Sequence, residues 1–262
     1  MRKIFYISFL AVGLLLISVS VNAQDKTRST GTENNPIGKI MVVPFEPKLY
    51  MSEIDKKVND QTKWSFNQIR ENFRHQLDVQ LQQKFKPYSS VISFYSDSAK
   101  MAKDLEYLYG STHLVFDPVN NPTASATASS APTRAIKNGQ VEVEMNDDKK
   151  FTNLLIENKE ALPYFTKKYH TEYFVFINQL DIKNDASTYN ITTDSYQRKV
   201  DIHYTIFDKN GKLIVAGIAS STFSSKENNP KKIVSLSFAP AANYIAGKFI
   251  AAVRPAPVTP KK

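Results

Sequence analysis

The residues best placed for chemistry follow two predicted strands near the start of the chain. One apolar run lies in IGKIMVVPFEP (37–47), and a second, SSVISFYS, covers 89–96. If these strands are parallel, their carboxyl ends share one edge of a sheet, where open α/β sheets bind ligands. The side chains expected there are Glu46, Lys48, Tyr50, Tyr95, Asp97 and Lys100. We interpret them as a partner-contact rim. The alternative is ordinary loop charges, with Tyr50 packed beneath the loop.

The turn Pro-Phe-Glu-Pro at 44–47 argues against a phosphate site. A phosphate cradle needs glycines, because backbone N–H groups must close on the anion. Pro44 and Pro47 have no N–H to offer, and the carboxylate of Glu46 would repel a phosphate. The first strand is therefore expected to be a core strand followed by a turn that its prolines make rigid.

The familiar motifs of catalysis and metal binding do not occur in the sequence. It has no glycine-rich nucleotide loop, no nucleophile elbow and no HExxH pair. Four histidines fall in four predicted elements, none with a second ligand at helical spacing: His75, His113, His170 and His203. We therefore predict no catalytic residue, no cofactor and no metal. A hydrolase whose carboxylates come from distant segments stays open as an alternative.

A long helix between the two strands must position the rim. Helical periodicity covers 52–85, with a restart near 62–65, where Ser65 and Gln68 match a capping box. The apolar stripe consists of Phe66, Ile69, Phe73, Leu77, Leu81 and Phe85, and Glu71, Arg74, Asp78 and Gln82 fall off it. A strand, a helix and a strand form a right-handed crossover, so the two strands are expected to be parallel.

The second half of the chain predicts an antiparallel end to the sheet. A helix is expected over 151–169 and a central strand over 172–182. After a polar turn at 183–196, the strand at 198–208 alternates, with Asp201, His203 and Thr205 on a wet face. A turn at Asn210-Gly211 leads to a return strand at 213–225, a loop at 227–232 and a last helix that opens at Ser237 and Pro240. The predicted fold class is α/β: a layered sandwich of a mixed sheet, with a parallel βαβ start, an antiparallel carboxyl-terminal hairpin and covering helices.

A stretch rich in Ala, Ser, Thr, Pro and Asn interrupts this order at 117–139. Its composition predicts a disordered insertion. Its flanks, 112–116 and 140–145, have strand character and are expected to pair as a hairpin arm. The predicted organisation is a signal peptide at 1–23, a flexible leader at 24–36, one α/β domain at 37–253 and a Pro-rich tail at 254–262.

The first residues indicate export. A basic start, MRK, precedes an apolar run, and Val21 and Ala23 fit the −3 and −1 positions of a signal-peptidase site. An uncleaved anchor is the alternative, because the run is close to the ~18 residues that span a bilayer. The chain contains no cysteine, which excludes disulfides and a lipid-modified amino terminus. We expect a periplasmic protein, with outer-membrane association or secretion as alternatives.

The charge of the chain argues against nucleic acid as a partner. The formal net charge is +9, and loss of the signal peptide with Arg2 and Lys3 would remove two charges and leave +7. The basic residues are spread along the chain, whereas a nucleic-acid footprint is clustered. We expect at most peripheral membrane contact.

Two segments resemble a group of bacterial envelope proteins. KIMVVPFEP before a long helix, and YFTKKYHTEYFVFINQLDI before an Asn-Gly hairpin, are similar to the curli-secretion and TolB amino-terminal-like group. That group includes the lipoprotein activators of penicillin-binding proteins, and the resemblance covers most of 37–253 by order of elements. The chain departs from it at His170, Thr171 and Glu172, where the group has small residues around Ala-Asp, and it lacks the lipid-bearing cysteine. The resemblance implies a periplasmic, non-catalytic module that binds other envelope proteins or self-assembles.

We therefore expect an exported, non-catalytic accessory or assembly protein of the cell envelope, acting through contacts with envelope proteins or with its own copies. One alternative is a subunit of a multimeric secretion channel or an outer-membrane-associated subunit. That alternative requires membrane-spanning strands of ~9–11 residues. The other is the hydrolase described above.

Overall fold

The computed structural model describes residues 37–95, 98–118, 135–137, 140–142 and 150–254. The predicted signal peptide and leader, most of the predicted insertion and the Pro-rich tail beyond 254 lie outside the described residues. The domain boundaries therefore stay predictions. Within the described part, β5 (Ala135–Lys137), at the end of the predicted insertion, pairs with β6 (Gln140–Glu142), in the flank that follows it.

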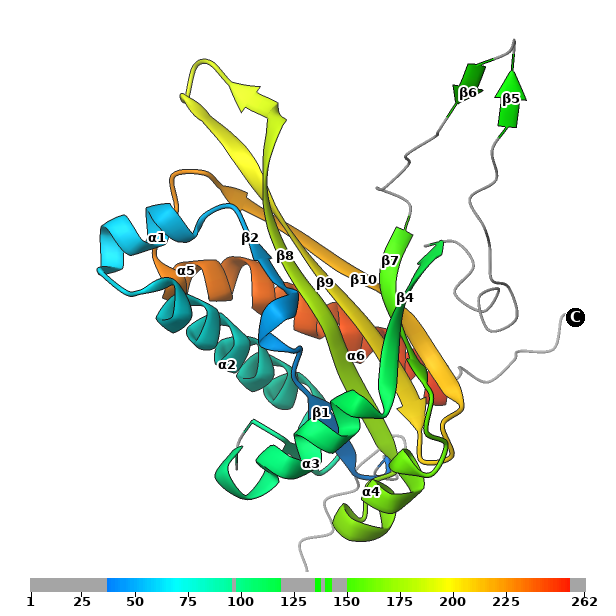
Figure 1. The fold of residues 1–262 in the computed structure, drawn as a ribbon. Coiled ribbons are helices and arrows are strands. Elements are labelled where there is room, and N and C mark those ends of the chain that lie inside the picture. The colour runs from blue at the N-terminus through cyan, green and yellow to red at the C-terminus, as the bar shows by residue number, and fades with distance from the viewer. Residues whose placement is uncertain (1–36, 96–97, 119–134, 138–139, 143–149, 255–262) are drawn as a thin grey trace, which may run out of the picture. The chain divides into compact units, whose positions relative to one another are not determined.

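A mixed sheet organises the protein (Figure 1). Its strands are β1 (Ile40–Val43), β3 (Val91–Ser93), β8 (Tyr173–Asn190), β9 (Ser195–Asp208) and β10 (Leu213–Ser224), in the order β10-β9-β8-β1-β3. β1 is parallel to both β3 and β8, whereas β8, β9 and β10 run antiparallel. A short strand, β2 (Tyr50–Ser52), continues the pairing along β8. This arrangement confirms the predicted α/β class and the parallel start.

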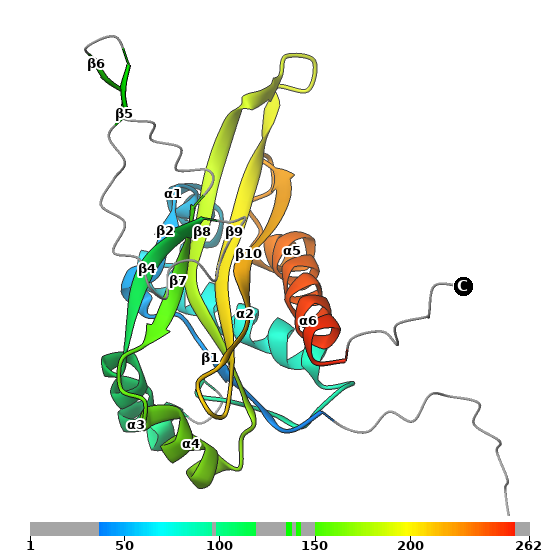
Figure 2. The ribbon, with the colours of Figure 1, turned by 90° about the vertical axis from the view of Figure 1, so that its right-hand side faces the viewer.

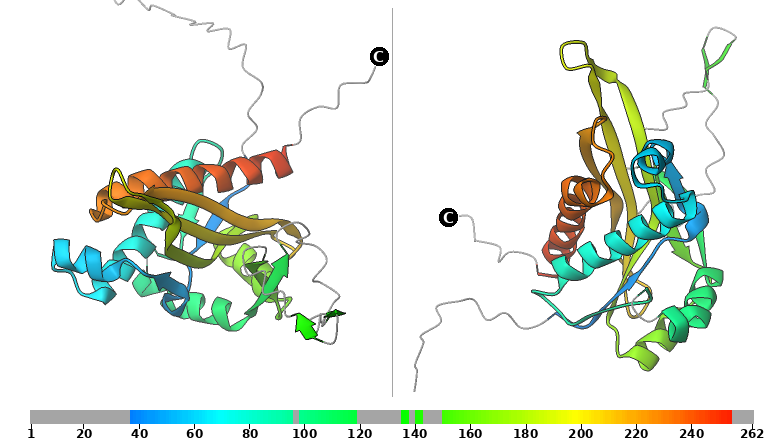
Figure 3. Two further views of the ribbon diagram at one scale, coloured as in Figure 1. Left: turned by 90° about the horizontal axis from the view of Figure 1, so that it is seen from above. Right: turned by 90° about the vertical axis from the view of Figure 1, so that its left-hand side faces the viewer.

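Helices cover one face of the sheet (Figure 3). They are α1 (Asp55–Thr62), α2 (Phe66–Phe85), α5 (Pro230–Ile233) and α6 (Ala239–Val253), the last two joined by a π-helical turn at Val234–Phe238. The predicted restart before α2 is confirmed: Ser65 and Gln68 form a capping box. Edge-to-face rings hold α2 against the π-helical turn and α6, with Phe73 on Phe238 and Phe85 on Phe249.

Two helices and a hairpin lie on the other face (Figure 2). They are α3 (Ser98–Gly110), α4 (Ala161–Tyr169) and the antiparallel pair β4 (Thr112–Pro118) and β7 (Lys150–Ile156). A second, separate core forms here from β1, β8, α3 and α4, including Val43, Phe94, Phe165, Phe174 and Phe176. The sheet is thus buried on both faces at its parallel end, as the unbroken apolar run of β1 indicates.

Two predictions about the arm were wrong. The segment at 112–116 pairs with β7, not with 140–145, and Lys150–Ile156 is a strand where a helix was expected. Phe151, Leu154 and Leu155 fit a helical period as well as a strand, and only the pairing with β4 decides between them. Asp117 and Pro118, assigned to the insertion, belong to β4.

Three boundaries also moved. The expected turn at 183–196 is mostly strand, because β8 continues to Asn190 and β9 begins at Ser195. The helical segment expected to begin at residue 52 begins at Asp55, after β2. The last helix begins at Pro230, because the Asn229 side chain accepts the N–H groups of Lys231 and Lys232.

By length and composition, one helical segment of the described part could cross a bilayer. It is Pro230–Val253, and half of it is buried within the protein. Its buried side chains, among them Ile245 and Phe249, pack into the core between α2 and the sheet. We therefore treat it as a core helix.

Candidate functional site

Three of the predicted rim residues lie together in the loop after β1. Glu46 and Lys48 form an ion pair of 2.7 Å, with Glu46 directly before and Lys48 inside a short 3-10 turn, Pro47–Leu49. Tyr50 is partly buried: its hydroxyl donates to Asp55 Oδ1 at 2.5 Å, and burial raises its pKa. The structure therefore matches the alternative interpretation for Tyr50, which packs beneath the loop.

The other three rim residues do not join this loop. The ring of Tyr95 stacks on His75 of α2, with centroids 4.9 Å apart, and its hydroxyl donates to the carbonyl of Glu71. Asp97 lies outside the described residues. Lys100 is in α3, but the position of its side chain is not described. The six residues therefore do not form one described surface.

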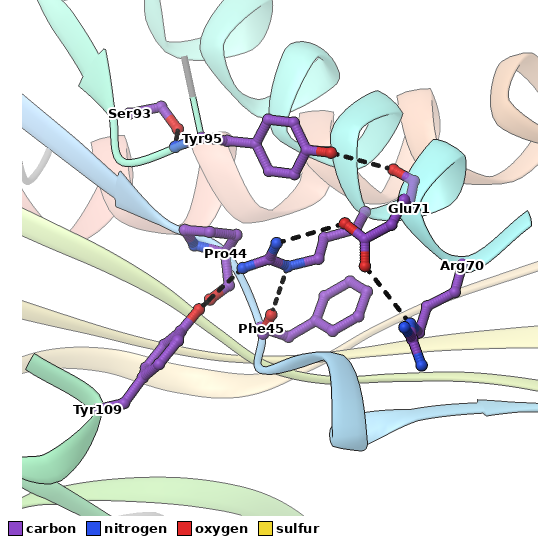
Figure 4. Close-up of polar contacts among 8 residues, drawn as sticks. Pro44, Phe45, Arg70, Glu71, Ser93, Tyr95 and Tyr109 are labelled. Carbon is purple, nitrogen blue, oxygen red and sulfur yellow. Dashed lines mark hydrogen bonds and ion pairs between the residues drawn. The ribbon is translucent and has the colours of Figure 1, made fainter. Parts of the chain in front are cut away.

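A buried arginine closes the carboxyl end of β1 (Figure 4). Arg74 Nε donates to the carbonyl of Phe45 at 2.7 Å, and Nη2 donates to the Tyr109 hydroxyl at 3.2 Å. That hydroxyl donates in turn to the carbonyl of Pro44 at 2.5 Å, and burial raises the pKa of Tyr109 to about 12. The guanidinium also lies over the Tyr95 ring, 5.2 Å from its centroid. The carbonyl groups of Pro44 and Phe45 are thus both held by side chains.

The sequence analysis placed Arg74 and Asp78 outside the apolar stripe of α2, and both are buried, at 9% and 2% exposure. Their polar groups are satisfied inside the protein, which is what permits burial. Asp78 accepts the Ser93 hydroxyl at 2.5 Å and the Gln82 amide at 2.6 Å, while burial raises its pKa. A one-stripe pattern cannot reveal such residues, because each partner comes from another element.

The face of β8 and β9 that lies away from α2 and α6 carries a polar cluster that was not among the predicted site residues. Register places Gln179 opposite His203, Asp181 opposite Asp201 and Lys183 opposite Lys199. Directly paired residues have Cβ atoms about 5 Å apart, so these six side chains form one patch. A pocket of about 390 Å³ opens over it, and its lining also includes Phe116, Lys150, Thr152 and Ile218.

The prediction that this face of β9 is exposed to solvent was wrong at the centre of the strand, because β7 covers it there. Asp201, His203 and Thr205 are 8%, 6% and 0% exposed. The backbone N–H of Thr152 donates to His203 Nδ1 at 2.8 Å, and that of Leu154 donates to Thr205 Oγ1 at 3.3 Å. Strand β7 therefore docks its edge on side chains of the sheet. The alternation seen in the sequence was a real signal of a polar face, but not of exposure.

These contacts fix the state of His203. Because Nδ1 accepts from a backbone N–H, the neutral ring carries its proton on Nε2. Burial is the main cause that lowers the pKa of His203, against the opposing effect of Asp181 and Asp201. In the described part of the chain, the contact recorded for Nε2 is Asp181 Oδ2 at 3.8 Å, beyond hydrogen-bond distance.

Both carboxylates of the patch are already paired. Asp181 accepts the Gln179 amide at 2.6 Å and faces Lys183 Nζ at 3.2 Å. Asp201 accepts the Ser220 hydroxyl at 2.5 Å and faces Lys199 Nζ at 3.0 Å. This network of ion pairs and hydrogen bonds suits ligand binding better than proton transfer, because each carboxylate faces a lysine and accepts a hydrogen bond.

The edge of the sheet formed by β10 is the longest open strand edge in the described structure. β10 pairs with β9 along one side and has no strand on its other side among the described residues. Its sequence, LIVAGIASSTFS, contains no charged residue and no proline. Natural sheets normally protect such an edge with lysine, proline or a covering segment.

No protein-family model matches the chain, and no curated protein matches it either. The resemblance to the curli-secretion and TolB amino-terminal-like group is therefore carried forward as a proposal. Among the described residues, no group of three or more His, Asp or Glu side chains is arranged to hold a metal ion.

Proposed function

We propose that the chain is an exported, non-catalytic accessory or assembly protein of the cell envelope. In this proposal it binds another envelope protein, or a second copy of itself, by accepting an extended segment along β10. The observation that carries the proposal is the open edge of β10, which has an irregular register between Leu213 and Val215 but no charge and no proline along its length. Strand addition to an open edge is a common way for proteins to bind extended segments.

The composition of the edge supports this function. Across the twelve residues of β10, backbone N–H and C=O groups alternate in direction, so about half of them point away from β9. Uncharged neighbours leave these groups available to an incoming strand, because no charged side chain needs to be moved or desolvated. The exposed side chains along the strand are small and polar, Ser220 and Thr222.

The alternative of a channel subunit receives less support from the described hairpin. β8 and β9 extend beyond the rest of the sheet (Figure 1), and β8 reads KNDASTYN from 183 to 190. A strand that faces lipid needs alternating apolar residues, and this segment has one large hydrophobic side chain, Tyr189. The part of the predicted arm at 143–145 lies outside the described residues.

The hydrolase alternative would require two carboxylates free to act as acid and base. Asp181 and Asp201 lie opposite each other in the described sheet, and each is paired with lysine as set out above. We therefore prefer the contact function.

Site-specific photo-cross-linking tests this proposal. A photoreactive amino acid would replace Thr222 on β10 or, as a control, Asn67, which is also exposed, on α2. The protein would be irradiated in its own envelope. We expect adducts of defined mass from position 222 and few from position 67, and the mass distinguishes a second copy from another protein. Equal yields at the two positions, or none at 222, would contradict the proposal.

A further inference from the structure

The pocket over the polar face of β8 and β9 has the properties of a ligand site. It is concave, about 390 Å³, and lies within the usual size range of small-molecule sites, roughly 300–1,000 Å³. It is separate from the outer edge of β10 and from the turn after β1, where Arg74 and Tyr109 bind the backbone carbonyls. What it binds can be inferred from the groups that line it.

One wall of the pocket is an exposed aromatic ring. Phe116 of β4 is 74% exposed, and it lies opposite Thr152 of β7 in the hairpin that covers the polar patch. Exposure of a large apolar ring costs free energy, which burial under a ligand would recover. A flat ring beside a polar floor suits a molecule with one apolar face and many polar edges.

The floor of the pocket supplies both acceptors and donors at fixed positions. The carboxylates of Asp181 and Asp201 each have lone pairs beyond those used by their partners, since an ionised carboxylate can accept about four hydrogen bonds. The His203 ring offers Nε2–H, because Nδ1 is occupied by the Thr152 N–H. These groups match hydroxyls, which donate and accept together.

The side chains that line the pocket carry a small net positive charge. Lys150, Lys183 and Lys199 line it with two aspartates, and neutral His203 adds no charge, so the lining has a net charge of +1. Lys183 and Lys199 face Asp181 and Asp201. No carboxylate is recorded beside Lys150 in the described part of the chain. One negative group on the ligand would balance this lysine.

We propose that this pocket binds a saccharide bearing one negative charge. The sugar ring packs its apolar face on Phe116, its hydroxyls bond to Asp181, Asp201 and His203, and its acid group pairs with Lys150. The charge comes from a carboxylate, as in a uronic or muramic acid, or from a phosphate ester. The saccharide proposal is independent of the proposed strand addition at the edge of β10, and the two proposals are tested by separate experiments.

Calorimetric titration of the purified protein with four matched probes tests the site. The probes are glucuronic acid, glucose and acetate, which separate the ring from the charge, and glucose 1-phosphate replaces carboxylate with phosphate. We expect the charged sugars to bind at least about tenfold more tightly than glucose or acetate, which corresponds to one charge-assisted contact. The tighter of the two charged sugars identifies the acid group. Equal affinities for glucose and both charged sugars, or no binding by either charged sugar at millimolar concentration, would overturn the proposal.

Two exposed variants locate the site without disturbing the core. Phe116→Ala should weaken binding of the charged sugar roughly 3–10-fold, whereas Phe66→Ala, which removes an exposed ring from α2, should leave it unchanged. Lys150→Gln should abolish the preference for the charged sugar over glucose, and Lys159→Gln on a distant loop should keep it. Equal effects of site and control variants would overturn the assignment to this pocket.

Discussion

Replacement of Arg74 by methionine tests how the end of β1 is held. Methionine fills similar space but has no donors. It removes the 2.7 Å bond to the Phe45 carbonyl, the bond to the Tyr109 hydroxyl and the contact with the Tyr95 ring. A charged hydrogen bond contributes about 1.5–3 kcal/mol, and a cation–π contact at a partly exposed ring about 0.5–1 kcal/mol. The ion pair with Glu71, 3.6 Å long and partly exposed, adds ~0–1 kcal/mol.

Together these contacts are worth at least about 3.5 kcal/mol, and methionine recovers part of this because it avoids the desolvation cost of a buried guanidinium. The expected loss for Arg74→Met is therefore about 3–4 kcal/mol in the free energy of unfolding. Urea denaturation followed by circular dichroism measures it. Arg70→Met is the matched control, because Arg70 lies one turn earlier on α2 and pairs with the same Glu71, at 3.4 Å, but is more exposed. We expect that control to lose less than about 0.5 kcal/mol. A loss below about 1 kcal/mol for Arg74→Met, or equal losses for the two variants, would refute the assigned role of Arg74.

Three further changes have defined outcomes. Burial lowers the pKa of His203 in the folded protein, so the free energy of unfolding should fall as the pH drops below about 6.5, where the unfolded chain takes up the proton more readily. His203→Gln should reduce this dependence of the free energy of unfolding on pH, as measured by urea denaturation between about pH 7.5 and 5.5. Phe249→Ala should cost about 3–5 kcal/mol, because the ring is fully buried against Phe85, and thermal denaturation would detect it. Ser65→Ala should cost about 1 kcal/mol by removing the cap of α2, and a change near zero in the same assay would count against the capping box.

The parallel half of the sheet could be predicted because its signals are local. The unbroken apolar run of β1, the long amphipathic α2 and the capping box at Ser65 each lie in one short segment. Together they imply the crossover and hence the parallel pairing of β1 with β3. The antiparallel end followed from the alternation in β9 and the turn at Asn210-Gly211 in the same way.

The sites could not be predicted so well, because they depend on contacts between distant segments. Nothing near Arg74 in the sequence shows that Phe45 and Tyr109 will meet it. The burial of His203 depends on β7, about fifty residues away along the chain, which itself was expected to be helical. The rim stays a prediction, because Asp97 and the side chain of Lys100 lie outside the described residues. The contacts that partly bury Tyr50 and Tyr95 come from Asp55 of α1 and His75 of α2, which no local pattern shows.

Amide hydrogen exchange along β10 tests the central proposal most directly. The protein would be cross-linked mildly and isolated from its own envelope with its partner, and compared with the protein purified alone. If a partner strand adds to β10, the amides of 213–224 that point away from β9 should exchange at least about tenfold more slowly in the complex. Unchanged exchange in β10, with new protection on another surface, would contradict the account.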